Sequence, residues 1–377
     1  MSELERYDVV IIGAGIQGLG IAEQASQLGK TVLVVEKNSD VGQETSSNSS
    51  KLIHGGLRYL ETLQLKLVYE CLAERKYLLE KCPSLVKIKP FVIPVYETSN
   101  RSWWWVLLGL SLYALLGGLS RDNRFSSMPK SQWSTLGIDT NGLKKVYRYY
   151  DAQTDDTRLT QWVSCVAESL GVRLLCNTAM TSAKEYQDGY LVQLSGDLQV
   201  QTNVLINASG PWVNEIAETI ENAPTEPITL VQGSHLVLDF PSFHLHSEEA
   251  CYYLESPVDG RPFFVLPWKG KIMVGTTETR RDDAHARVEE FEREYLINNF
   301  RHYFPDLNAD RDSIIGEYSG VRVLPGESGS GSRFGSKPRD TRYLSKSDAT
   351  RQYLAVYGGK LTSYRASAKK ALGLLKV

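Results

Sequence analysis

The sequence has 377 residues, of which 42% are hydrophobic and 23% charged, and its formal net charge is −2. These values are ordinary for a globular protein of two domains, or of one large core with insertions, and they argue against a nucleic-acid-binding protein, which usually carries a basic surplus. The five scattered cysteines, without a C-x-x-C pair, argue against a disulfide framework and a zinc site. The acidic N-terminal segment shows no signal peptide, so we expect a cytoplasmic location.

The first predicted elements form a strand–helix–strand unit over residues 7–36. The unbroken apolar run 9–12 predicts a parallel strand that is buried on both faces. Gly13, Gly15 and Gly18 follow in the order G-x-G-x-x-G. These glycines permit a tight turn, the close approach of a pyrophosphate and close packing of the next helix against the sheet.

The second half of this unit strengthens the interpretation. The helix, expected over 16–28, presents its N-terminus to the phosphates. Glu36 follows the second strand, expected over 31–35, at the spacing of a carboxylate that binds a ribose hydroxyl. The unit therefore predicts a dinucleotide site, without distinguishing NAD from FAD.

A polar loop over 38–50 leads into the segment SKLIHGGLRYLE, in which His54 and Arg58 flank a double glycine. Apolar residues at helical spacing then predict a helix over 63–82. The uncharged segment 103–119 begins with three tryptophans and has a weakly polar face. It is either a buried helix, a helix that lies on a membrane or an apolar partner, or a membrane-spanning helix.

The middle of the chain predicts a helix over 159–169, a strand over 172–176 and paired strands over 190–194 and 199–201. A separate apolar strand, 204–208, ends in the sequence Ala-Ser-Gly-Pro-Trp. A turn of small residues at the carboxyl end of such a strand is where ligands bind in open α/β sheets. A plain strand-to-helix turn explains these residues equally well.

Residues 227–318 are rich in strands, which predicts a separate antiparallel sheet that forms a substrate or cap domain. Within it we expect a helix over 289–303 whose Phe291, Tyr295 and Phe300 face inward. The glycine- and serine-rich stretch 326–342 is typical of a mobile surface loop.

A final strand is expected over 354–357, and a helix from about Leu361. Gly358 and Gly359 are expected to open that helix and to place backbone N–H groups and a positive dipole end at a bound ligand. Lys360 adds a full positive charge there.

Six long motifs run along nearly the whole chain. They are SSNSSKLIHGGLRYLE (46–61), NASGPWV (207–213), QGSH (232–235), VGTT (274–277), YSGVRVLP (318–325) and YGGKLTSYR (357–365). These motifs resemble the FAD-dependent, membrane-associated, quinone-reducing glycerol-3-phosphate dehydrogenases. The resemblance implies FAD as the cofactor. It also implies a Rossmann-like FAD-binding domain of the glutathione-reductase/D-amino-acid-oxidase type with an antiparallel β-sheet cap domain.

The expected FAD-binding domain is discontinuous, and the rest of the chain forms the cap. The ranges are 1–90, 150–226 and 316–377 for the FAD-binding domain, and 91–149 and 227–315 for the cap. Members of the family usually continue into a further helical domain, whereas this sequence stops at Val377. We therefore expect the contribution of that domain to be absent or supplied by a partner.

The resemblance and the glycine-rich unit together predict a set of cofactor-binding residues along these motifs. The set is Gly13, Gly15, Gly18, Glu36, Lys37, Ser46, Ser50, Lys51, Leu52, His54, Gly55, Gly56, Ala179, Ser209, Gly210, Trp212, Gly358, Gly359, Lys360, Leu361 and Thr362.

Oxidation of a phosphorylated alcohol needs fixed cations and a proton acceptor. Arginine suits a phosphate because its planar guanidinium can bond two oxygens at once. We expect Arg58, Arg322 and Lys360 to bind and orient the substrate, with weaker expectations for Tyr59 and Arg339. The expected proton acceptor is His235, since an unperturbed histidine titrates near physiological pH.

The predicted activity is oxidation of sn-glycerol 3-phosphate to dihydroxyacetone phosphate, with electrons passed through FAD to a quinone. One alternative is an FAD-dependent oxidase or dehydrogenase of an amino acid or a 2-hydroxy acid, whose carboxylate could use the same arginines. Another is a non-catalytic FAD-binding subunit. Peripheral contact with the inner face of the cytoplasmic membrane, through 103–119, is a further hypothesis. Neither nucleic acid nor a metal is expected.

Overall fold

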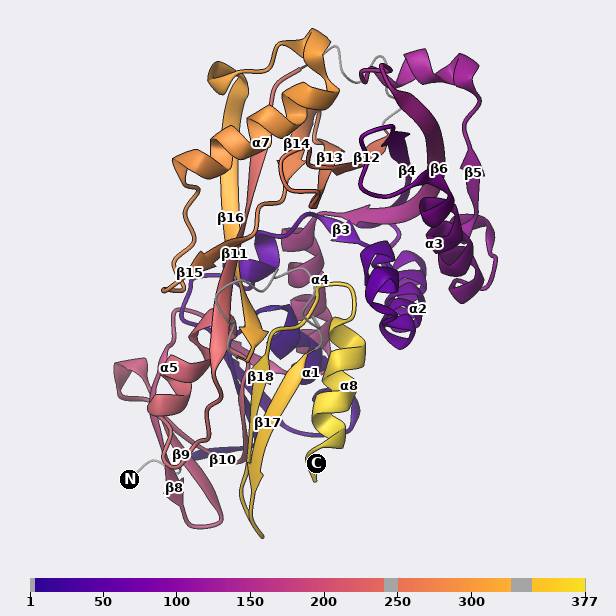
Figure 1. Cartoon of the computed structure of the whole chain (residues 1–377). Coiled ribbons are helices and arrows are strands. Elements are labelled where there is room, and N and C mark those ends of the chain that lie inside the picture. Colours follow the sequence, from indigo (N-terminus) through magenta and orange to yellow (C-terminus); the bar gives the residue numbers. More distant parts are fainter. Residues whose placement is uncertain (1–3, 241–249, 327–340, 377) are drawn as a thin grey trace.

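The computed structural model describes residues 4–240, 250–326 and 341–376, and in this part of the chain the strands form two sheets (Figure 1). In Figure 1 the first sheet lies in the lower half together with both chain ends, and the second lies in the upper half beside α7. The helices are α1 (Ile16–Gln27), α2 (Leu65–Lys81), α3 (Trp103–Leu116), α4 (Asp156–Ser169), α5 (Val213–Glu218), α7 (Glu290–Tyr303) and α8 (Tyr364–Gly373), and a 3-10 helix, η2, spans Leu57–Thr62.

The first sheet has a parallel centre with the strand order β17-β18-β10-β1-β2-β7, and β9 and β8 add a hairpin beside β10. β18, β10, β1, β2 and β7 run parallel. This arrangement confirms the predicted Rossmann-like unit. The strands are β1 (Glu5–Ile12), β2 (Val32–Val35), β7 (Arg173–Leu175), β8 (Met180–Tyr186), β9 (Gly189–Leu194), β10 (Gln199–Asn207), β17 (Arg342–Ser347) and β18 (Gln352–Tyr357).

Strand β1 explains why this sheet forms where it does. Val9 and Ile11 pack into a core with α1 and α8 on one face, whereas Val10 and Ile12 pack into a second core on the other face. An apolar run with no polar alternation suits a strand that is covered on both sides. The carboxyl ends of the parallel strands then meet at one edge of the sheet.

The second sheet has the order β15-β11-β14-β13-β12-β4-β6-β3, with β16 beside β11 and β5 beside β6. Its β12–β4 pair is parallel, so the sheet is mixed and not wholly antiparallel as predicted. The strands are β3 (Leu52–Ile53), β4 (Val86–Tyr96), β5 (Phe125–Ser127), β6 (Leu143–Thr154), β11 (Ile228–Leu238), β12 (Cys251–Glu255), β13 (Pro262–Trp268), β14 (Lys271–Gly275), β15 (Thr279–Arg281) and β16 (Ile314–Pro325).

Two local predictions were wrong. The expected separate strands 199–201 and 204–208 are one continuous strand, β10, since residues between them pair with β1. Phe291 is 57% exposed instead of facing inward, because the buried face of α7 begins at the next residue, Glu292, and continues to the fully buried Phe300. The predicted domain division stays a prediction, and most of the loop 326–342 lies outside the described residues.

The ambiguous apolar segment forms α3, which lies beside α2 at one edge of the molecule (Figure 1). Its Trp103, Trp104 and Trp105 are 49%, 55% and 44% exposed, so the first of the three alternatives, a buried helix, does not hold for this end. Leu110, Tyr113 and Ala114 form its buried face. Among the described residues, every helix is too short or too polar to cross a bilayer.

Candidate FAD and substrate site

A cavity of about 460 Å³ lies at the carboxyl edge of the first sheet and is closed by the second sheet. Its walls include residues that directly follow β1, β2, β10 and β18, and residues of β11 and β16. This edge is where open α/β sheets bind their ligands. The cavity therefore combines the predicted nucleotide site with residues of the predicted cap.

The glycine-rich turn after β1 is shaped by close backbone contacts. Gly13 has a positive φ of 100°, and a Cβ there would lie 2.7 Å from the carbonyl oxygen of Ala208. A Cβ on Gly18 would lie 2.0 Å from the carbonyl oxygen of Gly13, so Gly18 serves helix packing and does not line the cavity. Gly15 is the N-cap of α1 and supplies no side-chain acceptor. The N-terminus of α1 therefore faces the cavity without a side-chain cap of its own.

Glu36 lies at the end of β2, in the cavity wall. One carboxylate oxygen accepts the N–H of Ala14 at 2.8 Å, and the other accepts the N–H of Asn38 at 3.0 Å. The carboxylate thus fixes the glycine-rich turn, and its contact to a ribose stays a prediction. The ammonium of the neighbouring Lys37 lies 3.3 Å from the centre of the Trp212 ring. This contact joins the segment that follows β2 to the segment that follows β10.

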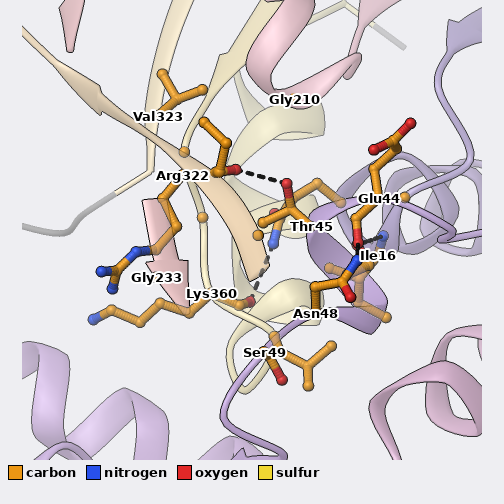
Figure 2. Close-up of a pocket in the computed structure, with 18 of the residues that line it drawn as sticks. Ile16, Glu44, Thr45, Asn48, Ser49, Gly210, Gly233, Arg322, Val323 and Lys360 are labelled. Atoms are coloured by element: carbon orange, nitrogen blue, oxygen red, sulfur yellow. Dashed lines mark hydrogen bonds between the residues drawn. The ribbon is translucent and has the colours of Figure 1, made fainter. Parts of the chain in front are cut away.

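The polar loop before β3 joins the two sheets (Figure 2). Thr45 Oγ1 donates to the carbonyl oxygen of Val321 at 2.7 Å, and Ser46 Oγ accepts the N–H of Ile16 at 3.0 Å. Ser50 Oγ lies 2.9 Å from His235 Nε2. The loop is thus bonded to the N-terminus of α1 and to two neighbouring strands of the second sheet, β16 and β11.

Two predicted cofactor-binding residues in this region face elsewhere. Lys51 is buried and donates to Asp156 at 2.6 Å. The N–H of Gly55 donates to the hydroxyl of Tyr113 at 2.8 Å. Like Gly18, both lie outside the cavity wall, where they support residues that line it. The other predicted cofactor-binding residues all line the cavity.

The three predicted substrate-binding cations, Arg58, Arg322 and Lys360, line the same cavity. Figure 2 shows the side chains of Arg322 and Lys360 extending in the same direction. Lys360 Nζ lies 3.9 Å from the centre of the Tyr59 ring and is buried without a hydrogen-bond partner among the described residues. A buried ammonium in this state is costly unless an anion or acceptor joins it. Arg339 lies outside the described residues.

The double glycine after β18 forms a loop and does not open a helix as predicted. Both residues have positive φ, and α8 begins only at Tyr364. A Cβ on Gly359 would lie 2.6 Å from the side chain of Gln17, which donates to the carbonyl oxygen of Lys360 at 3.1 Å. The glycines therefore allow α1 to hold the chain that carries Lys360.

His235 is buried and differs from the titrating histidine that the sequence predicts. Its ring stacks on Tyr318 with centroids 4.8 Å apart, and its Nδ1 has no hydrogen-bond partner among the described residues. Burial, together with the positive charges of Lys51 and Arg322, lowers its pKa to about 3. The imidazole is therefore neutral at physiological pH, the form that can accept a proton, but the imidazolium is strongly disfavoured.

This shift makes stability pH-dependent. The unfolded chain binds a proton on His235 below about pH 6.5, whereas the folded chain excludes it until about pH 3, so stability should fall as pH decreases through this range. Between pH 6.5 and 5 the expected loss is about 2 kcal/mol. Urea unfolding at several pH values measures this loss. The free energy of unfolding of a His235→Gln variant should fall less between pH 6.5 and 5 than that of the wild type. The control His302→Gln, which replaces an exposed histidine, should behave like the wild type. If the free energy of unfolding depends on pH equally in the wild type and in His235→Gln, the lowered pKa of His235 is contradicted.

The residues of the cavity fit FAD. The N-terminus of α1, whose N-cap Gly15 has no side chain, suits the pyrophosphate. Glu36 suits a ribose hydroxyl, and the unpartnered ammonium of Lys360 suits an anionic group at the far end. The close backbone contacts at Gly13 leave that turn no room for side chains.

Sequence reasoning missed Glu278 and Arg261, which both line the cavity. Glu278 lies one residue beyond the motif 274–277, and a charged residue directly after a family-like motif was an available signal. Arg261 lies directly before strand β13 and carried no such signal. The aromatic wall formed by Phe91, Tyr149 and Phe264 was also missed, because aromatic residues are frequent throughout the chain.

Comparison with known proteins agrees with this geometry. The chain is 36% identical to the aerobic glycerol-3-phosphate dehydrogenase of Staphylococcus haemolyticus, over 98% of its own length and 67% of that protein. It is 33% identical to D-erythritol 1-phosphate dehydrogenase of Brucella abortus, over 100% of its own length and 75% of that protein. The chain thus spans about two thirds to three quarters of these relatives.

A solved structure shares the fold over nearly the whole chain. L-α-glycerophosphate oxidase from Mycoplasma pneumoniae, with FAD bound, superposes with a TM-score of 0.78 and 19% identity, over 99% of this chain and 96% of that one. The family model described as "FAD dependent oxidoreductase", abbreviated DAO, matches residues 8–364. The chain therefore belongs to the DAO family of FAD-dependent oxidoreductases.

Proposed function

We propose that this protein oxidises sn-glycerol 3-phosphate to dihydroxyacetone phosphate, with FAD as the hydride acceptor. The observation that carries the proposal is the presence of Arg58, Arg322 and Lys360 in the wall of one cavity. A phosphate dianion is the ligand that such a set of fixed cations suits best. The names of the relatives support the same class of substrate.

The reaction removes a hydride and a proton from a secondary alcohol, and bound FAD supplies the hydride acceptor. Arg58 and Arg322 hold the phosphate, which fixes the position of the carbon to be oxidised. Lys360 stabilises negative charge that develops at this end of the cavity. His235 lies in the cavity wall and is neutral, so it is our proposed acceptor of the hydroxyl proton. Its low pKa makes it a weak base, and a bound phosphate dianion would raise that pKa by offsetting the charge of Arg322.

Anaerobic titration of the flavin-loaded protein with sn-glycerol 3-phosphate tests the proposal. The visible absorbance of the oxidised flavin should be lost as substrate is added, and dihydroxyacetone phosphate should appear in equal amount. An unchanged spectrum at saturating substrate would reject glycerol 3-phosphate as the substrate. Parallel titrations with amino acids and 2-hydroxy acids cover the alternative substrate classes.

A longer polyol phosphate is a second candidate substrate. It is favoured by the relative that is named D-erythritol 1-phosphate dehydrogenase. The match to that relative covers the full length of this chain. Both substrates present a phosphate and a secondary alcohol, so the same cations serve them. The ratio of kcat/KM for glycerol 3-phosphate and erythritol phosphate decides between the two.

We propose a quinone as the electron acceptor and the exposed face of α3 as a peripheral membrane contact. Trp103, Trp104 and Trp105 gather on this helix, and Leu63 of the adjoining segment is also exposed. Amphipathic tryptophan rings favour the interface between lipid and water, and a quinone is dissolved in the lipid. Rapid reoxidation by air with release of peroxide would favour oxygen as the acceptor instead.

Replacing the three tryptophans with alanine should reduce co-flotation with liposomes. Each ring removes a large apolar surface from the contact, so a severalfold loss of the bound fraction is expected. Phe291→Ala, which removes an exposed aromatic ring from α7, is the matched control and should float like the wild type. Equal flotation of all three proteins would reject α3 as the contact.

A further inference from the structure

Glu278 places one carboxylate oxygen between the two arginines of the cavity. Its Oε1 lies 3.7 Å from Arg58 Nη1 and 3.6 Å from Arg322 Nη2. The side chain of Glu278 is 7% exposed, compared with 23% for Arg58 and 32% for Arg322. The carboxylate therefore lies deeper than the guanidinium groups that it joins.

The backbone around Glu278 is held rigidly from both sides. Thr277 and Thr279 each donate a side-chain hydrogen bond to Oε1 of Glu292, at 2.6 and 2.8 Å. Glu292 is fully buried in α7. Arg261 Nη1 donates to the carbonyl oxygen of Glu278 at 3.2 Å. These bonds make Glu278 a fixed point in the cavity wall.

The two arginines come from different parts of the chain. Arg58 lies in η2, after the double glycine, whereas Arg322 lies in β16 of the second sheet. Two guanidinium groups that approach the same carboxylate repel each other, and both side chains are long and flexible. Both separations from Oε1 exceed an ordinary hydrogen bond, so the attraction is mainly Coulombic.

We propose that Glu278 is a positioning residue that holds Arg58 and Arg322 as a pair, ready to bind the phosphate of the substrate. This inference rests on the proposed function, since it names the residue that assembles the phosphate site. Arg261 adds little net charge there, because Asp259 lies 2.7 Å from its Nε. Glu278 thus balances part of the charge of the arginine pair until the phosphate arrives.

A Glu278→Gln variant distinguishes a positioning role from a purely electrostatic role of this carboxylate, because the two roles predict opposite changes in the affinity for an anion. Removing a negative charge beside an anion site should tighten anion binding if the arginines stay in place. If Glu278 positions them, the opposite follows, because the two guanidinium groups move apart. We expect the dissociation constant for the phosphate analogue methylphosphonate to rise about tenfold.

Isothermal titration calorimetry of the flavin-loaded protein with methylphosphonate gives this constant without turnover. Glu278→Asp, which keeps the charge, should restore most of the affinity. Glu317→Gln, which removes a carboxylate paired with Arg293 outside the cavity wall, is the matched control and should bind like the wild type. In turnover, Glu278→Gln should raise KM far more than it lowers kcat.

The outcomes separate this inference from the proposed reaction. Unchanged or tighter binding of methylphosphonate to Glu278→Gln would overturn the positioning role. The two results can also differ. If Glu278→Gln binds methylphosphonate more weakly but no polyol phosphate reduces the flavin of the wild type, the positioning role is supported and the reaction is rejected. A wild-type protein that does not bind methylphosphonate would overturn the positioning role, whereas the flavin titration alone decides the reaction.

Discussion

An Arg322→Ala variant should bind sn-glycerol 3-phosphate about a hundredfold more weakly than the wild type, because the loss of a charge-assisted contact to a phosphate costs about 3 kcal/mol. Arg322 lines the cavity beside Lys360, and its guanidinium approaches the same carboxylate as Arg58. The way in which the anaerobic rate of flavin reduction saturates with substrate concentration measures this affinity. Flavin content should be unchanged, since the expected role of Arg322 concerns the substrate and not the cofactor.

Two further variants sharpen this prediction. Arg322→Lys keeps the charge but loses the planar fork, so its affinity should lie between those of wild type and alanine variant. Arg342→Ala removes an arginine that pairs with Glu226 outside the cavity wall, and it should bind substrate normally. An Arg322→Ala variant with wild-type affinity would mean that the phosphate lies elsewhere.

The glycine-rich turn and the strands beside it were predictable because their signals are local. The run 9–12 must be buried on both faces, and Gly13 adopts a positive φ that few other residues tolerate. The structure confirms the strand and the helix that follows, apart from small shifts at their ends. Such features depend on neighbours in the sequence, so one chain is enough to read them.

The environment of His235 was not predictable, because it depends on residues that are distant in the sequence. Its pKa is lowered by burial and by the charges of Lys51 and Arg322, which reach it from another loop and another strand. The exposure of α3 is a similar case, since apolar periodicity cannot say which neighbours cover a helix. Glu278 differs, since its place directly after the motif 274–277 was a local signal, but its pairing with Arg58 of a distant segment was not predictable.

The second large effect is expected at Asp156, which lies in the first turn of α4, outside the cavity wall. Its carboxylate accepts the ammonium of Lys51 at 2.6 Å, and also the N–H and the hydroxyl of Ser49 at 2.9 and 2.7 Å. The ammonium of Lys51 also donates to the carbonyl oxygen of Ser47 at 2.7 Å. This network fixes the loop that carries Ser46 and Ser50 into the cavity.

Asp156→Ala should lower the free energy of unfolding by about 3–5 kcal/mol, because it leaves a buried ammonium without its counter-ion. The loop should also loosen, so the purified variant should contain less FAD per chain than the wild type. Urea unfolding and the ratio of flavin to protein absorbance measure the two effects. As a control, Lys144→Ala breaks an exposed pair with Glu97 and should leave both nearly unchanged.

The double variant Lys51→Met/Asp156→Leu distinguishes two effects of Asp156: its effect on stability as a buried charge and its effect on the loop as a hydrogen-bond acceptor. Burial raises the pKa of Asp156 in spite of Lys51, which indicates that the pair pays a large desolvation cost in the folded protein. Replacing both partners with apolar residues removes that cost, so the double variant should be more stable than either single variant. It still lacks the acceptor for Ser49, so its flavin content should remain low. Recovery of both stability and flavin content would show that the loop does not depend on this carboxylate.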